Sequence, residues 1–520
     1  MGMESVGSRH AGATRPRLAV LLTTVLALVV RLVWLGSKSL WVDEADSFYF
    51  ASHTFPDILL RLCDPHPPAY YALLRLFLGL GRSEFWIRLP SAIAGALAIP
   101  LLYLLGRELS LALDAPRLSR RTAVLASLLL AVAPLHVWYS QEARMYAMVT
   151  TLGLCAVYFA LRFALHREAV WAVGYVLAAS AALYTDQTSA LPLLLANLVW
   201  GMLWIHRCQP RTGRGWWQLV AWSGLQVVVG LAFWLWWSHA LFPSLFRSDT
   251  LYQLAMLMLV LRRFGVSVSV DAIMLAFAAG AALLAVGGMV ACWLVARRHR
   301  LGKPMPGLAW AVVVVFLLGT VGSAVPRLFT LKRLLVSLLP YGLLVGAWAM
   351  HELQFKPWLL RGLLLLSVAL CVVNTAWWPK EPWREVVALV EREAGPGDVL
   401  WVDDLAVPAF DYYYGGPLQR QVLRTAHLRE FHETLAHQRG SPREGRIWVL
   451  LKVDAYRNLL DYFSPSLSES LLWSGDWHHV SVRAYAPPAP NAGPLAPAVD
   501  PPPWLSAWPS PVHEACQTRE

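Results

Sequence analysis

Charged residues are scarce in this chain. Asp, Glu, Lys and Arg together make up 15% of its 520 residues, whereas an ordinary soluble domain carries about 25%. Hydrophobic residues reach 57%, and a water-soluble fold of this size could not bury that much apolar surface. The shortage of charge therefore excludes an ordinary soluble protein and predicts a polytopic membrane protein, mainly α-helical. The 26 Trp residues fit that class, because indole rings settle at the boundaries between water and lipid.

Paired cysteines and internal repeats are also missing. The six cysteines are scattered, and no two of them have the spacing of metal ligands. A disulfide framework is therefore not expected. The lack of a clear internal repeat counts against a transporter built from inverted halves.

Acidic residues are fewer than basic ones, and the formal net charge is +11. The arginines are spread over short loops between apolar runs rather than along one polar face, so nucleic acid is not an expected partner. Positive charge retained on the cytoplasmic side of a membrane accounts for much of the excess. Membrane lipid is the partner that this distribution predicts.

The apolar runs predict about eleven spans of near-membrane length. No small-residue cleavage site follows the first run, which predicts a retained helix rather than a signal peptide. The predicted spans are 18–35, 86–106, 120–136, 145–163, 169–185, 189–206, 217–238, 271–296, 307–325, 333–350 and 358–377.

Loop charges predict the orientation of these spans. Basic residues recur in every second loop, for example at Arg107 and Arg297, and the positive-inside rule assigns those loops and residues 1–17 to the cytoplasm. The alternate loops then face outward, as does everything after Trp378. We expect a multi-pass protein of the inner (plasma) membrane.

The region after the last span has a different character. Residues 378–486 are mixed polar, with a helical stretch at Glu385–Glu393, a turn at Gly395–Asp398 and strand-like runs such as Val399–Val402. This order predicts a small extracytoplasmic α/β domain. Residues 487–520 are rich in Pro, Ala and Ser and are predicted to be disordered.

The first outward loop, 36–85, is too long for a simple connector within a transmembrane domain that spans 18–377. It begins with three carboxylates, Asp43, Glu44 and Asp46, and on a helix Asp43 and Asp46 would share a face. Crowded carboxylates suit a group that takes up a proton or a divalent cation site. A solvated loop with helix-capping carboxylates is the alternative.

Further polar groups follow on outward loops. The prolines around His66 hold that side chain in one orientation, and an interfacial helix that includes Tyr70 is expected to begin near Pro68. The second outward loop carries Glu142, Arg144 and Tyr146 between two apolar spans. Arg144 could bind a phosphate in a bidentate manner; an ion pair with Glu142, or snorkelling to the interface, is the alternative.

Two more outward stretches add candidates. Asp186 lies between two spans and could join the site or cap the following helix. Arg327 and Arg333 lie on the outer side, against the topology rule, where an anionic ligand or anchoring at the membrane boundary would explain them.

Four motifs in order resemble bacterial membrane glycosyltransferases of the GT-C fold, which are relatives of the protein O-mannosyltransferases, the aminoarabinose transferases of lipid A and the Rgt-type lipopolysaccharide glycosyltransferases. The motifs are Trp-x-Asp-Glu-Ala, His-Pro-Pro-x-Tyr-Tyr, Arg-Leu-Pro-Ser and Gln-Glu-Ala-Arg-Met-Tyr. The resemblance covers about residues 18–350, and the pattern of Pro382–Gly415 is similar to the outer domain of such proteins.

The resemblance implies roles for individual residues. Asp43 matches the catalytic base, and Glu44 its acidic neighbour. His66 and Arg144 match positions near the donor phosphate. Arg327 and Arg333 lie in motifs that depart from the Arg-Tyr of many relatives, and Asp186 stands where relatives often carry His. Some relatives bind a divalent cation near these acids, so Asp43, Glu44 and His66 are the candidate ligands if a metal is present.

These patterns predict transfer of one sugar from a polyprenyl-phosphate donor to a glycan, lipid or protein acceptor at the outer face of the cytoplasmic membrane. A carboxylate would deprotonate the acceptor and cations would stabilise the departing phosphate. A transporter or flippase of lipid-linked sugars, and a non-catalytic membrane scaffold, are the alternatives.

Overall fold

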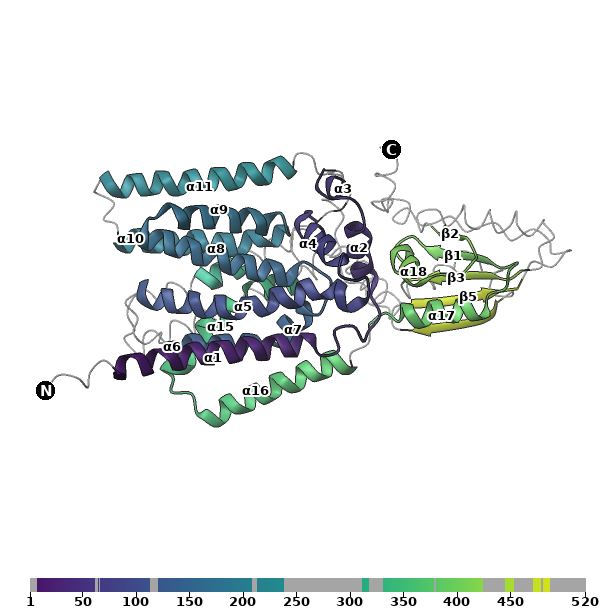
Figure 1. Ribbon diagram of the computed structural model, residues 1–520, viewed down its shortest axis with the longest axis horizontal. Helices are drawn as coiled ribbons and strands as arrows, with labels where there is room; N and C mark the ends of the chain where they lie inside the picture. The colour runs from purple at the N-terminus through teal and green to yellow at the C-terminus, as the bar shows by residue number, and fades with distance from the viewer. Residues whose placement is uncertain are drawn as a thin grey trace, which may run out of the picture. The chain divides into compact units, whose positions relative to one another are not determined.

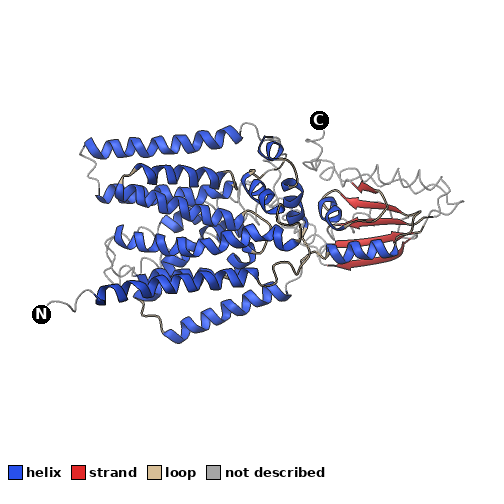
Figure 2. Ribbon diagram, viewed as in Figure 1, coloured by secondary structure: helices blue, strands red, loops and turns tan. Residues whose placement is uncertain are grey.

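The computed structural model describes residues 7–60, 64, 66–112, 120–207, 213–237, 311–317, 331–377, 380–423, 445–452, 471–477 and 480–486. The chain divides into two compact units. The first, the helical unit, comprises Met1–Leu35 and Thr54–Trp377; the second, the C-terminal unit, comprises Gly36–His53 and Trp378–Glu520. Figure 2 shows that the described strands all belong to the second unit.

Helices occupy most of the predicted spans of the helical unit (Figure 1). Its helices are α1 (Gly7–Leu32), α3 (Phe55–Leu60), α4 (Ala69–Leu78), α5 (Glu84–Ala112), α6 (Arg120–Ala131), α7 (Pro134–Ser140), α8 (Tyr146–His166), α9 (Ala169–Leu183), α10 (Ala190–Arg207), α11 (Gly213–Trp237), α15 (Leu331–Glu352) and α16 (Pro357–Val372), which continues into the π-helical turn η3 (Val373–Trp377). The predicted interfacial helix near Pro68 is confirmed as α4.

The membrane character is confirmed, while the number of spans is confirmed only in part. Within the described ranges, four helices are long and apolar enough to cross a membrane, or five if the bent pair α6 and α7 counts as one span. The predicted span 271–296 lies outside the described residues, and of 307–325 only 311–317 is described, as helix. Helix α1 begins earlier than predicted, at Gly7.

The helical unit is held together by a continuous apolar core. Small residues such as Ala98, Ala126 and Ala160 are fully buried in it, beside larger ones such as Ile99 and Tyr175. Many outward-facing side chains of α11 and α16 are exposed apolar groups, for example Leu231 and Leu365. This is the pattern of helices that meet lipid on one side and protein on the other.

The bend between α6 and α7 shows why an arginine is buried in this bundle. The two helices meet at 58°, because Pro134, at the start of α7, cannot donate a backbone hydrogen bond. Arg31 of α1 donates to the carbonyls of Ala131 (3.0 Å) and Leu130 (3.4 Å) at the break. Unsatisfied carbonyls in lipid cost several kcal/mol each, so the guanidinium compensates for the broken span.

A close helix contact completes this region. A Cβ on Gly95 of α5 would lie 2.1 Å from Ser140 Oγ and 3.0 Å from Arg31 Nε. Ser140 Oγ accepts from Arg31 Nε at 3.2 Å. Only glycine at position 95 leaves space for this hydrogen bond between α1 and α7.

The C-terminal unit is a mixed α/β structure, as predicted. Its sheet has five strands in the order β2-β1-β3-β5-β4. The strands are β1 (Val399–Asp403), β2 (Arg420–Leu423), β3 (Ile447–Leu451), β4 (Leu471–Trp477) and β5 (Val480–Tyr485). Strand β1 runs parallel to β2 and β3, while β5 runs antiparallel to β3 and β4. The predicted tail, 487–520, lies outside the described residues.

Among the described residues of this unit, three helices accompany the sheet: α2 (Val42–Ala51), α17 (Trp383–Glu393) and α18 (Val407–Tyr413). Helix α17 buries Trp383, Val386, Val387 and Val390, which is the i, i+3, i+4, i+7 spacing of one helical face. Helix α2 comes from the first long loop yet packs in this unit, so the segment predicted as one outer loop is shared between the two units.

Candidate functional site

Asp186 anchors a cluster of polar side chains in the helical unit. It lies between α9 and α10, where it precedes the short helix η1 (Gln187–Ser189), and it is fully buried. One carboxylate oxygen accepts from the Thr188 backbone N–H at 2.8 Å and from its hydroxyl at 2.5 Å. The predicted capping role is therefore confirmed.

The second carboxylate oxygen of Asp186 bonds to His66. Asp186 Oδ2 lies 3.0 Å from His66 Nδ1, and the histidine side chain is 9% exposed. The other ring nitrogen, Nε2, lies 3.1 Å from Arg144 Nη2. Because a guanidinium can only donate, Nε2 accepts, and the proton of the neutral imidazole sits on Nδ1 and is donated to Asp186. Capping and membership of the polar cluster are thus compatible for Asp186.

This hydrogen-bonded chain sets the charge state of Asp186. Burial alone would raise the pKa of its carboxyl group. The hydrogen bond from His66, the charge of Arg333 and the hydrogen bond from Thr188 outweigh burial and hold that pKa well below its ordinary value. Asp186 is therefore a carboxylate at neutral pH, and it orients His66, which in turn orients Arg144.

A second arginine shares an aromatic neighbour with Arg144. The Arg144 guanidinium lies 5.9 Å from the centre of the Tyr146 ring, and that of Arg333, near the start of α15, lies 5.4 Å from the same ring. Both distances are within reach of a cation–π interaction. Arg144 is 4% exposed, so its side chain is enclosed by protein and does not snorkel to water.

The backbone around Arg144 is also held. Ser91 of α5 donates to the Arg144 carbonyl at 2.9 Å, and its hydroxyl lies 2.8 Å from that of the fully buried Tyr70. Asp64 accepts from the His66 backbone N–H at 2.7 Å and from the Tyr71 hydroxyl at 3.0 Å. The backbone is therefore held at both ends of the Arg144–His66 contact, by Ser91 at Arg144 and by Asp64 at His66.

The loop-one acids lie in the C-terminal unit, on α2. Asp43 and Asp46 are half-buried, and Glu44 is fully buried. Glu44 accepts from Lys380 Nζ at 3.1 Å and from the Trp41 backbone N–H at 3.4 Å. The neighbouring acids Asp43 and Glu44 therefore differ in environment, since Asp43 is half-buried and Glu44 is fully buried.

Residues at the start of α17 and at the end of α18 hold this acid helix. Glu381 accepts from the Val42 backbone N–H at 3.1 Å and from Trp383 Nε1 at 2.8 Å. The Tyr413 hydroxyl accepts from the Leu40 backbone N–H at 2.8 Å. Burial raises the pKa of Glu381, and the charge of Asp43 adds to that increase.

Lys452, which follows β3, lies among four carboxylates. Burial alone would lower the pKa of its ammonium group, but the negative charges of four neighbours raise that pKa above its ordinary value. These neighbours are Asp43, Glu381, Asp46 and Asp403. Two lysines of the C-terminal unit therefore neutralise part of the charge that α2 carries.

The predicted residues thus fall into two groups. His66, Arg144, Tyr146, Asp186 and Arg333 meet in the helical unit. Tyr70 is connected to Arg144 through Ser91, and the buried Glu142 lies close to Arg144 in the chain. Asp43, Glu44 and Asp46 share α2 in the C-terminal unit. Arg327 lies outside the described residues.

The described residues do not form a metal site. No group of three or more His, Cys, Asp or Glu side chains among them has a suitable arrangement. Both ring nitrogens of His66 already have hydrogen-bond partners, Asp186 and Arg144. His66 therefore has no ring nitrogen left to ligate a cation while it keeps these two hydrogen bonds.

Sequence reasoning missed Lys380, Glu381 and Lys452. A signal for the first two was present. The last predicted span ends at Trp377, and Lys380 and Glu381 follow soon after it on the predicted outer side. A lysine there departs from the positive-inside rule and points to a local acidic partner. Lys452 had no comparable signal, because it follows an ordinary buried strand.

Residues 65–237 match the family of dolichyl-phosphate-mannose-protein mannosyltransferases. No relative was found among curated proteins. Among solved structures, the chain is similar to apo ArnT from Cupriavidus metallidurans, with 17% identity over 92% of this chain and 99% of that one and a TM-score of 0.47. For the same protein bound to undecaprenyl phosphate the identity is 16%, over 89% of this chain and 97% of that one, with a TM-score of 0.46. For the Archaeoglobus fulgidus oligosaccharyltransferase the identity is 11%, over 87% of this chain and 69% of that one, with a TM-score of 0.44.

Proposed function

We propose that this membrane glycosyltransferase transfers one sugar from a polyprenyl-phosphate donor to an acceptor hydroxyl at the outer face of the cytoplasmic membrane. Residues 65–237 match the family of dolichyl-phosphate-mannose-protein mannosyltransferases. The family name itself specifies a sugar carried on a lipid phosphate. The observation that carries the proposal is the Asp186–His66–Arg144 chain.

Arg144 is the proposed ligand of the donor phosphate. A guanidinium binds a phosphate through parallel N–H donors, and the strength of this contact depends on how well the side chain is oriented beforehand. Asp186 and His66 supply that orientation, since each hydrogen bond fixes the next group. Arg333, on the same tyrosine ring, is the proposed second cation.

His66 acts on the phosphate through Arg144. Its Nε2 already accepts from the guanidinium, so it is a positioning residue rather than a direct ligand. Asp186 fixes the tautomer of the imidazole in the same way that carboxylates fix histidines in other catalytic sites.

Asp43 is the proposed base. The acceptor hydroxyl loses its proton to the Asp43 carboxylate, and its oxygen forms a bond to the anomeric carbon. The bond between that carbon and the phosphate oxygen breaks, and the lipid phosphate leaves with the electron pair. Arg144 and Arg333 stabilise its negative charge. A single displacement of this kind inverts the anomeric centre.

The C-terminal unit is proposed to hold this base. Hydrogen bonds to the backbone of Leu40 and Val42, together with the buried Glu44–Lys380 ion pair, fix the start of α2. Asp43 lies in that first turn, beside the charge of Lys452. A carboxylate must be held in place to remove a proton efficiently.

Binding of the lipid phosphate can be tested without knowing the sugar. The probe is sugar-free polyprenyl phosphate added to the full-length protein in nanodiscs, with tryptophan fluorescence as the readout. Arg144→Gln should weaken binding about 10- to 100-fold, because a hydrogen bond to a charged group contributes about 1.5–3 kcal/mol. The matched control is Arg82→Gln at an exposed arginine of the same unit. Equal binding by wild type and Arg144→Gln would refute the phosphate assignment.

Catalysis is tested separately with Asp43→Asn. We expect this variant to bind polyprenyl phosphate normally and to lose transfer, measured by mass analysis of cell-envelope glycans in a deletion strain that expresses it. Full transfer by Asp43→Asn would overturn the assignment of the base. Movement of lipid-linked sugar across the membrane by this variant, without transfer, would instead support the transporter alternative.

A further inference from the structure

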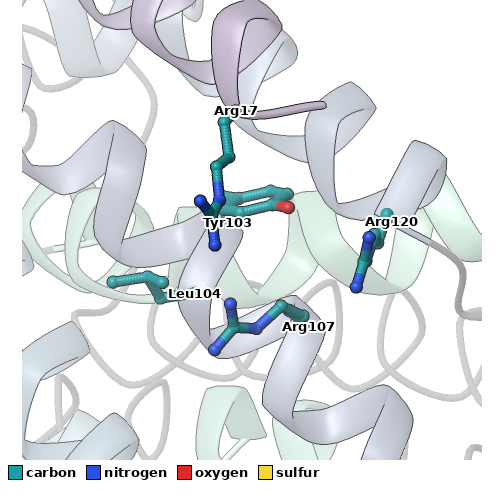
Figure 3. A pocket seen from close by; sticks show the side chains of 5 residues that line it. All are labelled: Arg17, Tyr103, Leu104, Arg107 and Arg120. Atoms are coloured by element: carbon teal, nitrogen blue, oxygen red, sulfur yellow. The ribbon is translucent and has the colours of Figure 1, made fainter. Parts of the chain in front are cut away.

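A cavity lined by arginines lies in the helical unit, away from every residue discussed above as a candidate for catalysis. Its volume is about 140 Å³, and its lining residues come from three helices (Figure 3). They are Arg17 of α1, Tyr103, Leu104 and Arg107 of α5, and Arg120 of α6. A single water molecule needs about 15 Å³ of such space, so the cavity can hold a larger group.

Helix α8 separates this cavity from the Arg144 cluster. Tyr146, beside Arg144, is its first residue, and Arg162 lies in its last turn but one. Arg162 bonds to Glu108, the neighbour of the cavity residue Arg107. With a rise of 1.5 Å per residue, Tyr146 and Arg162 lie about 24 Å apart along the helix. The cavity is therefore at the opposite end of the bundle and is not part of the proposed donor site.

The cavity has an excess of positive charge that the described residues do not balance. Glu108 is shared, since one of its oxygens accepts from Arg107 at 2.7 Å and the other from Arg162 at 3.0 Å. Arg17 and Arg120 form no ion pair within the described part of the chain. The buried Nε of Arg107 likewise has no hydrogen-bond partner there.

The chemistry of the lining selects an oxyanion with an apolar attachment. Guanidinium groups bind phosphate more specifically than ammonium groups, because their donors form a planar fork. The ring of Tyr103 and the side chain of Leu104 supply an apolar wall. Arginines at the ends of membrane-spanning helices lie at the depth of lipid head groups, and basic pockets between such helices bind anionic head groups.

We propose that this cavity binds the phosphate of an anionic phospholipid through Arg17, Arg107 and Arg120, at the end of the bundle opposite the donor site. The lipid would link α1, through Arg17, to Arg107 of α5 and Arg120 at the start of α6, and so stabilise the bundle at that end. The proposal is independent of the transfer reaction, since it requires only that these helices cross a membrane.

The test is native mass spectrometry of the full-length protein in detergent, with added phosphatidylglycerol, phosphatidylcholine or inorganic phosphate. We expect phosphatidylglycerol to be retained in preference to phosphatidylcholine. Arg17→Gln and Arg120→Gln should each weaken retention about fivefold, which corresponds to about 1 kcal/mol per basic residue. Neither arginine is in an ion pair among the described residues, so these variants should fold normally, whereas Arg107→Gln would also release Glu108.

Arg121→Gln is the matched control, because Arg121 is the exposed neighbour of Arg120 and does not line the cavity. Retention unaffected by Arg121→Gln but weakened by Arg120→Gln supports the site. Equal weakening by both variants would mean general surface attraction and would overturn the proposal. Equal retention of the two lipids, or displacement of phosphatidylglycerol by millimolar inorganic phosphate, would overturn the lipid as the source of the phosphate.

Discussion

The buried ion pair between Glu44 and Lys380 gives a quantitative test of how α2 is held. The Nζ–Oε2 distance is 3.1 Å, and the two side chains are 0% and 9% exposed respectively. Lys380→Met would leave the Glu44 carboxylate buried without this counter-charge. Breaking a buried pair in this way costs about 3–5 kcal/mol.

Protonation of Glu44 limits the magnitude of this destabilisation. A buried carboxylate that loses its partner can take up a proton instead. For a glutamate with the ordinary pKa of about 4.3, protonation at pH 7 costs about 3.7 kcal/mol, at 1.36 kcal/mol per pH unit. We therefore expect Lys380→Met to destabilise the C-terminal unit by about 3–4 kcal/mol. Removing both charges with Glu44→Gln and Lys380→Met together should restore most of that loss.

The assay is limited proteolysis of the full-length protein in nanodiscs, followed by loss of the intact C-terminal unit. When cleavage is slow, its rate follows the population of the opened state, so Lys380→Met should be cleaved several hundredfold faster than wild type. Arg392→Met is the control, since Arg392 and Glu393 form an exposed ion pair on α17 of the same unit. Such pairs contribute about 0–1 kcal/mol, and cleavage should change little.

Two outcomes would refute this reasoning. One is a Lys380→Met protein as resistant to proteolysis as wild type. The other is a double variant as unstable as the single one, because the cost would then not come from an uncompensated Glu44 charge. Transfer activity adds a further check, since a displaced α2 should reduce kcat while binding of polyprenyl phosphate by Arg144 remains normal.

Three further predictions concern the helical unit. Asp186→Asn should destabilise it at neutral pH. Because folding lowers the pKa of Asp186, the stability that its carboxylate contributes is fully present above about pH 4, the pKa of the unfolded state, and is lost as the pH falls further. The thermal unfolding curves of wild type and variant should therefore converge below pH 4 and not at pH 5–7. Gly95→Ala should lower the melting temperature, by an overpacking cost of about 1–3 kcal/mol, because its Cβ would lie 2.1 Å from Ser140 Oγ; an unchanged melting temperature would contradict this contact. Arg31→Met should reduce the yield of folded protein, judged by size-exclusion chromatography in detergent, because the Ala131 carbonyl at the α6–α7 break would lose the hydrogen bond that Arg31 donates; a normal yield would show that the break is satisfied otherwise.

The sequence by itself determined the membrane class, the positions of most described helices and the presence of a small α/β domain. Long apolar runs and alternating strand patterns are local properties, so they could be recognised without a partner. It also identified Arg144, His66 and Asp186 as candidates, because ionisable groups beside membrane spans are rare and costly.

Only the tertiary structure decided which of these groups meet. His66 is 78 residues from Arg144 and 120 from Asp186 in the chain, and no local pattern specifies the tautomer that joins them. Glu44 and Lys380, which form an ion pair, are 336 residues apart in the chain. Helix α2, which the sequence predicts within a loop of the membrane domain, therefore packs in the C-terminal unit. Such pairings depend on how distant helices and strands pack, and so the scarce charges of this chain acquire their partners only in the folded state.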